Sequence, residues 1–265
     1  MRLALDHLTV VDARPERLVK LAAKAGAQGC CLFLEGMAVL ANMPSYSLID
    51  DLAALRETRK QLIDNAITLD LVYPFTLSSR SKAESFAPAL EAAAELGAKA
   101  INLLVYDRDP ARQIEQVAQV CERAGHHGLK AVVEFFPRSA IAGLDQAVEL
   151  VGAVGATNLG INVDILHLYR SNSADLAKLV RHRELIGYAQ LADGPLLAPE
   201  DRDHEAGNQR QLPGLGELDI RAFVAAIGPA VGISVEVPDE VALRAGLTDE
   251  DRALAALNAA RQILS

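Results

Sequence analysis

Residues 130–165 read KAVVEFFPRSAIAGLDQAVELVGAVGATNLGINVDI, and this stretch contains the pattern that decides the fold. Two short apolar runs, at 130–136 and 159–165, flank a longer segment that is rich in Ala, Leu and Glu. Short apolar runs favour buried strands, and the segment between them favours a helix. Because strands that alternate with helices pair in parallel, the stretch predicts one unit of a parallel α/β protein.

The same alternation recurs along the chain. Helical patterns are found at 15–26, 50–65, 85–97, 112–125 and 251–264. Eight strands in a chain of 265 residues predict a single (β/α)8 TIM barrel domain over residues 1–265. A doubly wound open sheet is the alternative, but VVDARPE, after the first strand, is not a glycine-rich phosphate loop. The strand candidates are 2–8, 29–35, 67–73, 100–106, 130–136, 159–165, 186–192 and 232–238.

Composition narrows the setting of this domain. With 51% apolar and only 4% aromatic residues, the chain can bury a large aliphatic core. The net charge of −9 argues against nucleic acid or an anionic membrane as a partner. The positions of the three cysteines do not suggest a disulfide framework. Asp6 lies where the apolar region of a signal peptide would be expected. No apolar run is long enough to suggest a membrane span. We therefore expect a cytoplasmic protein.

Four polar residues end four consecutive strand candidates: Glu134 in VVEFFP, Asp164 in NVDILH, Gln190 in YAQLAD and Glu236 in SVEVPD. In a TIM barrel the active site lies at this end of the strands, so the four side chains should converge. No Lys or Arg lies late in these strands, although pairing with a basic residue is the alternative for each carboxylate. Buried carboxylates need a positive partner, and a hard divalent cation with oxygen ligands supplies it.

This reasoning predicts one divalent metal ion, to which Gln190 lends its carbonyl oxygen. Since no His or Cys is among the ligands, Mg²⁺ or Mn²⁺ is expected before Zn²⁺, with Co²⁺ and Ni²⁺ as open alternatives.

The motifs VVEFFP, VDILH, QLADG, RQLPGLGELD and SVEVP resemble those of the xylose isomerase-like TIM barrels, over essentially the whole chain. That superfamily contains sugar isomerases and epimerases, inosose dehydratases, 3-dehydroshikimate dehydratases and an endonuclease branch. The resemblance implies that Glu134, Asp164, Gln190 and Glu236 are the metal ligands. Gln190 departs from the sugar epimerases, which usually have His there, and Gln is associated with bacterial 3-dehydroshikimate dehydratases.

Further candidates surround these four residues. His167 follows Asp164 by three positions, and the resemblance implies that it faces the substrate, where it could act as a general acid or base. Arg170 could bind a carboxylate, a phosphate or a polyol oxygen, or could be a surface residue beside a helix start at 171–173. Arg210 resembles the family arginine that reaches the substrate, with an ordinary loop charge as the alternative.

His7 and Tyr106, near the ends of strands one and four, could line the far wall of the pocket, although such residues are more often structural. The segment 193–216 is long and polar and is bounded by Pro and Gly, which is typical of a lid over the barrel mouth. A plain surface loop or a contact between copies in a homo-oligomer are the alternatives for this segment.

These parts favour an isomerase or epimerase acting on a keto-sugar or polyol. Glu134 and Glu236 would flank the substrate and move a proton next to a metal-polarised carbonyl, and His167 would assist. The alternative is a dehydratase acting on a 3-dehydroshikimate-like or inosose-like ring. A metal-dependent phosphodiesterase would need more metals and more His ligands, and a non-catalytic barrel would bind no ion.

Overall fold

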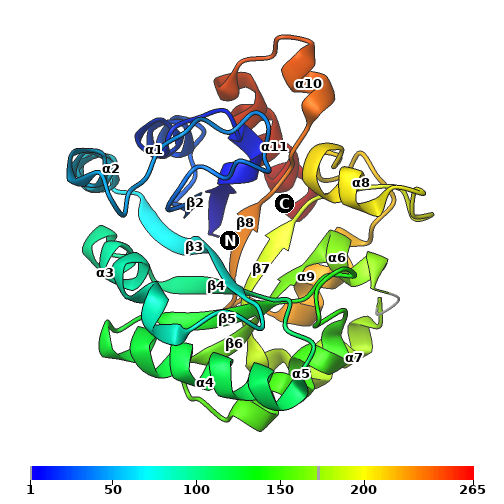
Figure 1. Cartoon of the computed structure of the whole chain (residues 1–265). Helices are drawn as coiled ribbons and strands as arrows, with labels where there is room; N and C mark the ends of the chain where they lie inside the picture. Colours follow the sequence, from blue (N-terminus) through cyan, green and yellow to red (C-terminus); the bar gives the residue numbers. More distant parts are fainter. Residues whose placement is uncertain (1, 172–173) are drawn as a thin grey trace.

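The computed structural model describes residues 2–171 and 174–265, and its eight parallel strands form a closed barrel (Figure 1). The first strand pairs in parallel with the last, which closes the barrel and confirms the predicted (β/α)8 fold. The helix start expected at 171–173 includes positions 172 and 173, which lie outside the described residues. The strands are β1 Leu3–Asp6, β2 Gly29–Phe33, β3 Thr68–Leu77, β4 Ala100–Val105, β5 Lys130–Glu134, β6 Leu159–Asp164, β7 Ile186–Leu191 and β8 Gly232–Val235.

Helices surround the barrel (Figure 1). Several of them begin at a side chain that caps their first turn. Asp51, Asp109 and Asp219 accept hydrogen bonds from backbone N–H groups that have no partner within the helix. None of the described helices is long and apolar enough to cross a membrane. The helices are α1 Pro15–Lys24, α2 Leu52–Asp64, α3 Ala87–Leu96, α4 Pro110–His126, α5 Leu144–Val154, α6 Ile165–Arg170, α7 Leu176–Arg181, α8 Arg202–Asn208, α9 Ile220–Ile227, α10 Glu240–Arg244 and α11 Asp249–Leu264, with 3-10 turns η1 His7–Val10, η2 Ala83–Phe86 and η3 Arg183–Leu185.

The alternation of side chains along each strand divides the core into two parts. One set of buried aliphatic residues packs between the strands and the helices. A smaller second cluster holds one or two residues from most of the strands. Because side chains two positions apart share a face, this second cluster marks the face that points into the barrel. Its members are Ala4, Cys31, Phe33, Leu71, Tyr73, Ala100, Val132 and Tyr188.

The same two-residue period carries polar side chains to the carboxyl end of the barrel interior. Glu134 lies two positions after Val132, and Gln190 lies two positions after Tyr188. In the strand register, Asp164 is opposite Gln190. Asp164 and Gln190 therefore lie side by side, while Glu134 is opposite Asn162 and Ser234 is opposite Gln190, so the polar residues of adjacent strands gather at the carboxyl end of the barrel.

Candidate active site

A cavity of about 860 Å³ opens at the carboxyl ends of the strands. Glu134, Gln190 and Glu236 line it, together with apolar and aromatic side chains that include Phe33, Tyr73, Tyr106 and Phe136. A volume of this size accommodates a small molecule, and the mixture of apolar walls with a few polar groups is typical of a ligand site.

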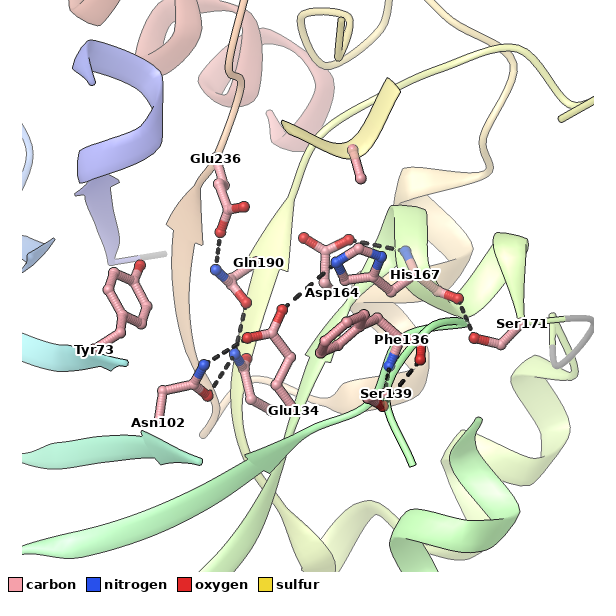
Figure 2. A network of polar contacts seen from close by, with 12 residues as sticks. Tyr73, Asn102, Glu134, Phe136, Ser139, Asp164, His167, Ser171, Gln190 and Glu236 are labelled. Carbon is pink, nitrogen blue, oxygen red and sulfur yellow. Dashed lines mark hydrogen bonds and ion pairs between the residues drawn. The ribbon is translucent and has the colours of Figure 1, made fainter. Parts of the chain in front are cut away.

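The structure brings the four predicted residues together. Glu134 and Asp164 are the last residues of β5 and β6, Gln190 is the penultimate residue of β7, and Glu236 directly follows β8. All four side chains are buried. In Figure 2, Gln190 lies between Glu134 and Glu236, with Asp164 nearby.

Arg210, which the family resemblance implied would reach the substrate, instead pairs with two of the predicted metal ligands. Its Nη1 atom is 2.5 Å from Asp164 Oδ2, and its Nη2 atom is 2.9 Å from Glu236 Oε1. The guanidinium is buried, and its Nε donates to the carbonyl oxygen of Ala206 at 2.8 Å. Two of the four predicted ligands are therefore paired with an arginine that comes from the loop after β7, and not from a strand end.

The amide of Gln190 is also engaged. Its Nε2 donates to Glu236 and, at 3.4 Å, to Asp6, while its Oε1 accepts from Asn162 Nδ2 at 2.6 Å (Figure 2). The carbonyl oxygen that was expected to face a metal thus already has one hydrogen-bond donor. A carbonyl oxygen has a second lone pair, which leaves room for one more partner.

Buried carboxyl groups outnumber basic groups among the described residues at the floor of the cavity, where the strands end. Asp6 joins Glu134, Asp164 and Glu236 as a fourth buried carboxyl group, against the single guanidinium of Arg210. Burial and the nearby Asp164 raise the pKa of Glu134 to about 7. Burial raises the pKa of Asp6 to about 6, although a hydrogen bond from Tyr73 opposes the rise.

Two further carboxyl groups respond to Arg210 in different ways. Burial would raise the pKa of Asp164, but Arg210 and His167 outweigh it, so the pKa is lowered. Burial raises the pKa of Glu236 well above its usual range despite Arg210, and repulsion from Asp6 and Asp164 adds to the rise. A bound cation, or protonation of some of these carboxyl groups, would therefore stabilise the floor.

His167 lies beside Glu134 at the start of α6. Its Nε2 is 3.6 Å from Glu134 Oε1, and its ring packs against Phe136 with centroids 5.5 Å apart. The backbone N–H of His167 donates to Asp164 Oδ1, which caps helix α6. Burial lowers the pKa of His167 to about 4, so the imidazole is neutral at physiological pH and could accept a proton.

The other substrate-contact candidates fall in different places. Arg210 and Tyr106 line the cavity, and Tyr106 stands half-exposed at its mouth. Arg170 also lines the cavity, but its Nε and Nη2 form a buried ion pair with Glu205 at 2.6 Å. His7 is fully buried and absent from the described cavity lining. Its ring nitrogens contact the Ala13 carbonyl oxygen at 2.9 Å and the Phe33 N–H at 3.2 Å, which gives it a structural role in place of the expected substrate contact.

Residues 193–216 form one wall of the cavity. The segment contains α8, whose Asp203 pairs with Arg138 across the mouth and whose Glu205 pairs with Arg170. Asp193 holds the end of the segment, because its carboxylate accepts from the backbone N–H groups of Gly214 and Leu218. The position of this segment suits the expected lid, which stays a prediction.

Three polar residues of the floor were not singled out from the sequence. Asp6 ends β1, and Asn102 and Asn162 lie inside β4 and β6. Asn102 Nδ2 donates to Glu134 Oε2 at 2.5 Å, and Asn162 Nδ2 donates to Asn102 Oδ1 at 3.2 Å. The available signal was an amide side chain within an otherwise apolar run, as in AINLLV and GINVDI.

The donor atoms of the floor suit a hard cation, since they are carboxylate and amide oxygens. In the arrangement described for residues 2–171 and 174–265, no three His, Cys, Asp or Glu side chains are grouped as a metal site. Arg210 contacts both Asp164 and Glu236, so an ion held by these two carboxylates requires the guanidinium to withdraw. The ligand chemistry and the excess of negative charge fit a divalent ion on this condition.

Several solved structures share this fold. The IolI protein with a binding zinc atom matches with a TM-score of 0.81 and 20% identity, over 100% of this chain and 98% of its own. The probable 3-DHS dehydratase AsbF of Bacillus anthracis matches with a TM-score of 0.75 and 18% identity, over 98% of this chain and 99% of its own. D-allulose 3-epimerase of Methylomonas sp. matches with a TM-score of 0.73 and 14% identity, over 100% of this chain and 98% of its own.

At these identities the structural matches establish the fold alone. No curated protein sequence matches the chain. The model of the xylose isomerase-like TIM barrel family matches residues 19–263. This match covers nearly the whole barrel, including the four strand-end residues and Arg210, and the chain therefore belongs to the xylose isomerase-like TIM barrel family.

Proposed function

We propose that this chain is a divalent-metal-dependent isomerase or epimerase that acts on a small keto-sugar or polyol. The observation that supports it most is the excess of buried carboxyl groups on the cavity floor. Asp6, Glu134, Asp164 and Glu236 face one another with Arg210 as their only ion-pair partner among the described Lys and Arg side chains. A barrel that keeps so much negative charge at the end of its strands sacrifices stability, and a cation site gives a reason for it.

Glu134, Asp164, Gln190 and Glu236 would hold the ion. When bound, a divalent ion polarises a substrate carbonyl and stabilises the negative charge that develops on its oxygen. Mg²⁺ or Mn²⁺ suits the oxygen donors best, whereas the zinc atom in the IolI structure belongs to a distant relative. Arg210, once it has turned away from Asp164, lies within the same cavity and can donate hydrogen bonds to a substrate oxygen.

Proton transfer would fall to residues on either side of Gln190. A general base works best when its pKa is close to the working pH, and the pKa of Glu134 is about 7. Glu236 also lines the cavity, on the other side of Gln190 from Glu134, and is available as the second proton-transfer group (Figure 2). Two carboxyl groups on different strands can exchange protons with two faces of one carbon, which epimerisation requires.

A dehydratase acting on a 3-dehydroshikimate-like or inosose-like ring is the second candidate. The specific observation in its favour is the His167 ring 3.6 Å from Glu134, because elimination needs both a base and an acid for the departing hydroxyl group. The fold shared with AsbF is compatible with it but does not distinguish the two reactions.

The proposal is tested by incubating the Mn²⁺-loaded protein with a mixture of metabolites in D₂O and following masses. Incorporation of deuterium without loss of water supports the isomerase or epimerase. Loss of water from one component supports the dehydratase. No turnover of any polyhydroxylated carbonyl compound, with the ion shown to be bound, contradicts both.

A further inference from the structure

A chain of three amide side chains joins Glu134 to Glu236 at the floor of the cavity. Figure 2 shows its two ends, with Asn102 beside Glu134 and Gln190 beside Glu236. From Glu134 the links run through Asn102, Asn162 and Gln190, each from a different strand. All three amides are buried. An amide side chain has nearly the same shape in its two orientations, so its hydrogen-bond partners decide which end faces which neighbour.

At each end of the chain an amide NH₂ group donates to a carboxyl oxygen, that of Glu134 at one end and that of Glu236 at the other. Asn102 therefore points its NH₂ group at Glu134 and its oxygen back along the chain. Gln190 likewise points its NH₂ group at Glu236 and Asp6, and its oxygen back along the chain. The residue between them must donate in both directions.

Asn162 is that residue. Its Nδ2 donates to Asn102 Oδ1 at 3.2 Å and to Gln190 Oε1 at 2.6 Å. An NH₂ group has two hydrogens and can make both bonds, whereas a hydroxyl group can donate only one. The Asn162 Oδ1 atom has no hydrogen-bond partner among residues 2–171 and 174–265. If the Asn162 amide were flipped, this oxygen would face the oxygens of Asn102 and Gln190. Leaving it without a hydrogen bond therefore costs less free energy than the flipped orientation.

We infer that Asn162 is a positioning residue that sets which end of the Gln190 amide faces Glu236 and holds Glu134 in place through Asn102. The inference deepens the proposed function, on which it rests, because Gln190 and Glu134 belong to the proposed ion site. Held from one side by Asn162, Gln190 Oε1 keeps a fixed direction for its remaining lone pair. Partners of this kind orient ligand side chains, and their loss typically lowers metal affinity or activity by about 10- to 100-fold.

Two substitutions remove the double donor in different ways. Asn162→Leu removes it without adding charge. Asn162→Asp keeps the size of the side chain but replaces the NH₂ group with an acceptor, so Gln190 then stands between two acceptors. The matched control is Asn158→Asp, since Asn158 Nδ2 also donates to two acceptors, the carbonyl oxygens of Cys121 and Leu129, just before β6 and outside the cavity.

The first measurement is the side-chain NH₂ signal of Gln190 in ¹⁵N-labelled protein, assigned by its loss in Gln190→Glu. We expect the signal to shift and to exchange with water at least about 10-fold faster in Asn162→Leu and to shift in Asn162→Asp, because the amide loses its fixed orientation. Asn158→Asp should leave it unchanged. An unchanged signal in both folded Asn162 variants would overturn the inference, whether or not the protein binds a metal.

The second measurement is the affinity for Mn²⁺ by calorimetry. Asn162→Leu, which removes the donor without adding charge, should bind the ion about 10- to 100-fold more weakly than the wild type, and Asn158→Asp should bind it equally well. If the wild type binds no Mn²⁺, the proposed function fails, while the amide signal still decides the role of Asn162. Equal Mn²⁺ affinity in Asn162→Leu and the wild type would refute the link between Asn162 and the ion site.

Discussion

Replacing Arg210 tests the charge arrangement of the cavity floor. Arg210→Met keeps an unbranched side chain but removes the guanidinium that pairs with Asp164 and Glu236, which lie 2.5 and 2.9 Å from it. Arg210 is 4% exposed and Asp164 is fully buried, so solvent screens these pairs little. Breaking a buried ion pair by removing one partner costs about 3–5 kcal/mol, because the remaining charge has no compensation.

The assay is urea unfolding of metal-free protein, followed by circular dichroism. With a urea dependence of about 3 kcal/mol per molar, the expected loss moves the midpoint down by roughly 1–2 M. The matched control is Arg17→Met, which breaks the exposed pair between Arg17 and Asp249 at 2.8 Å and should cost about 1 kcal/mol or less. Equal losses in the two variants would refute the view that Arg210 neutralises the floor.

Mn²⁺ extends the same experiment. Because the guanidinium no longer competes for Asp164 and Glu236, Arg210→Met should bind the ion more tightly than the wild type and regain part of its lost stability when the ion is added. Weaker binding in the variant would mean that Arg210 does not occupy space that the ion needs.

Three further predictions concern the lid, the acid–base group and a structural histidine. Shortening residues 198–209, with Arg170→Met so that no buried guanidinium is left unpaired, should raise KM or lower kcat while the circular dichroism spectrum is kept; loss of folding would mark the segment as structural. His167→Asn, with the ion shown to be retained, should lower kcat about 10²-fold or more in a dehydratase but only modestly in an epimerase; full activity would remove His167 from the site. Burial lowers the pKa of His7 from 6.5 to about 4, so the unfolded chain binds a proton first and stability should fall by roughly 3 kcal/mol as the pH drops through this window. Urea unfolding between pH 4 and 7 should show a shallower fall in His7→Phe, and an unchanged slope would contradict the burial of a neutral imidazole.

The barrel was predictable because its determinants are local. Each strand candidate is a short apolar run, and each of the eight overlaps an observed strand. The clearest difference is β3, expected to end at Tyr73 but continuing to Leu77, because Phe75, Thr76 and Leu77 pair with β4 beyond Pro74. A proline suggests the end of a strand, and here the neighbouring strand overrides that preference.

The site was predictable only where strand geometry determines it. Glu134 and Gln190 could be placed because the end of a strand and its two-residue period fix the position of a side chain. The family resemblance pointed to Arg210, but its pairing with Asp164 could not be predicted, because it comes from a long loop whose path depends on contacts such as those of Asp193. The role of Asn162 also depends on three strands meeting, which no single stretch of sequence reveals.

The central claim is that the cavity floor is a divalent ion site, and calorimetric titration of the chelator-treated protein with Mn²⁺ tests it most directly. We predict one ion per chain in the wild type. Binding should be weaker in Asp164→Ala and Glu236→Ala than in Gln190→Ala, because a neutral amide contributes less to the attraction than a carboxylate. Failure of the wild type to bind the ion, or equal binding in all three variants, would contradict the claim and leave Arg210 as the only cation that these carboxylates hold.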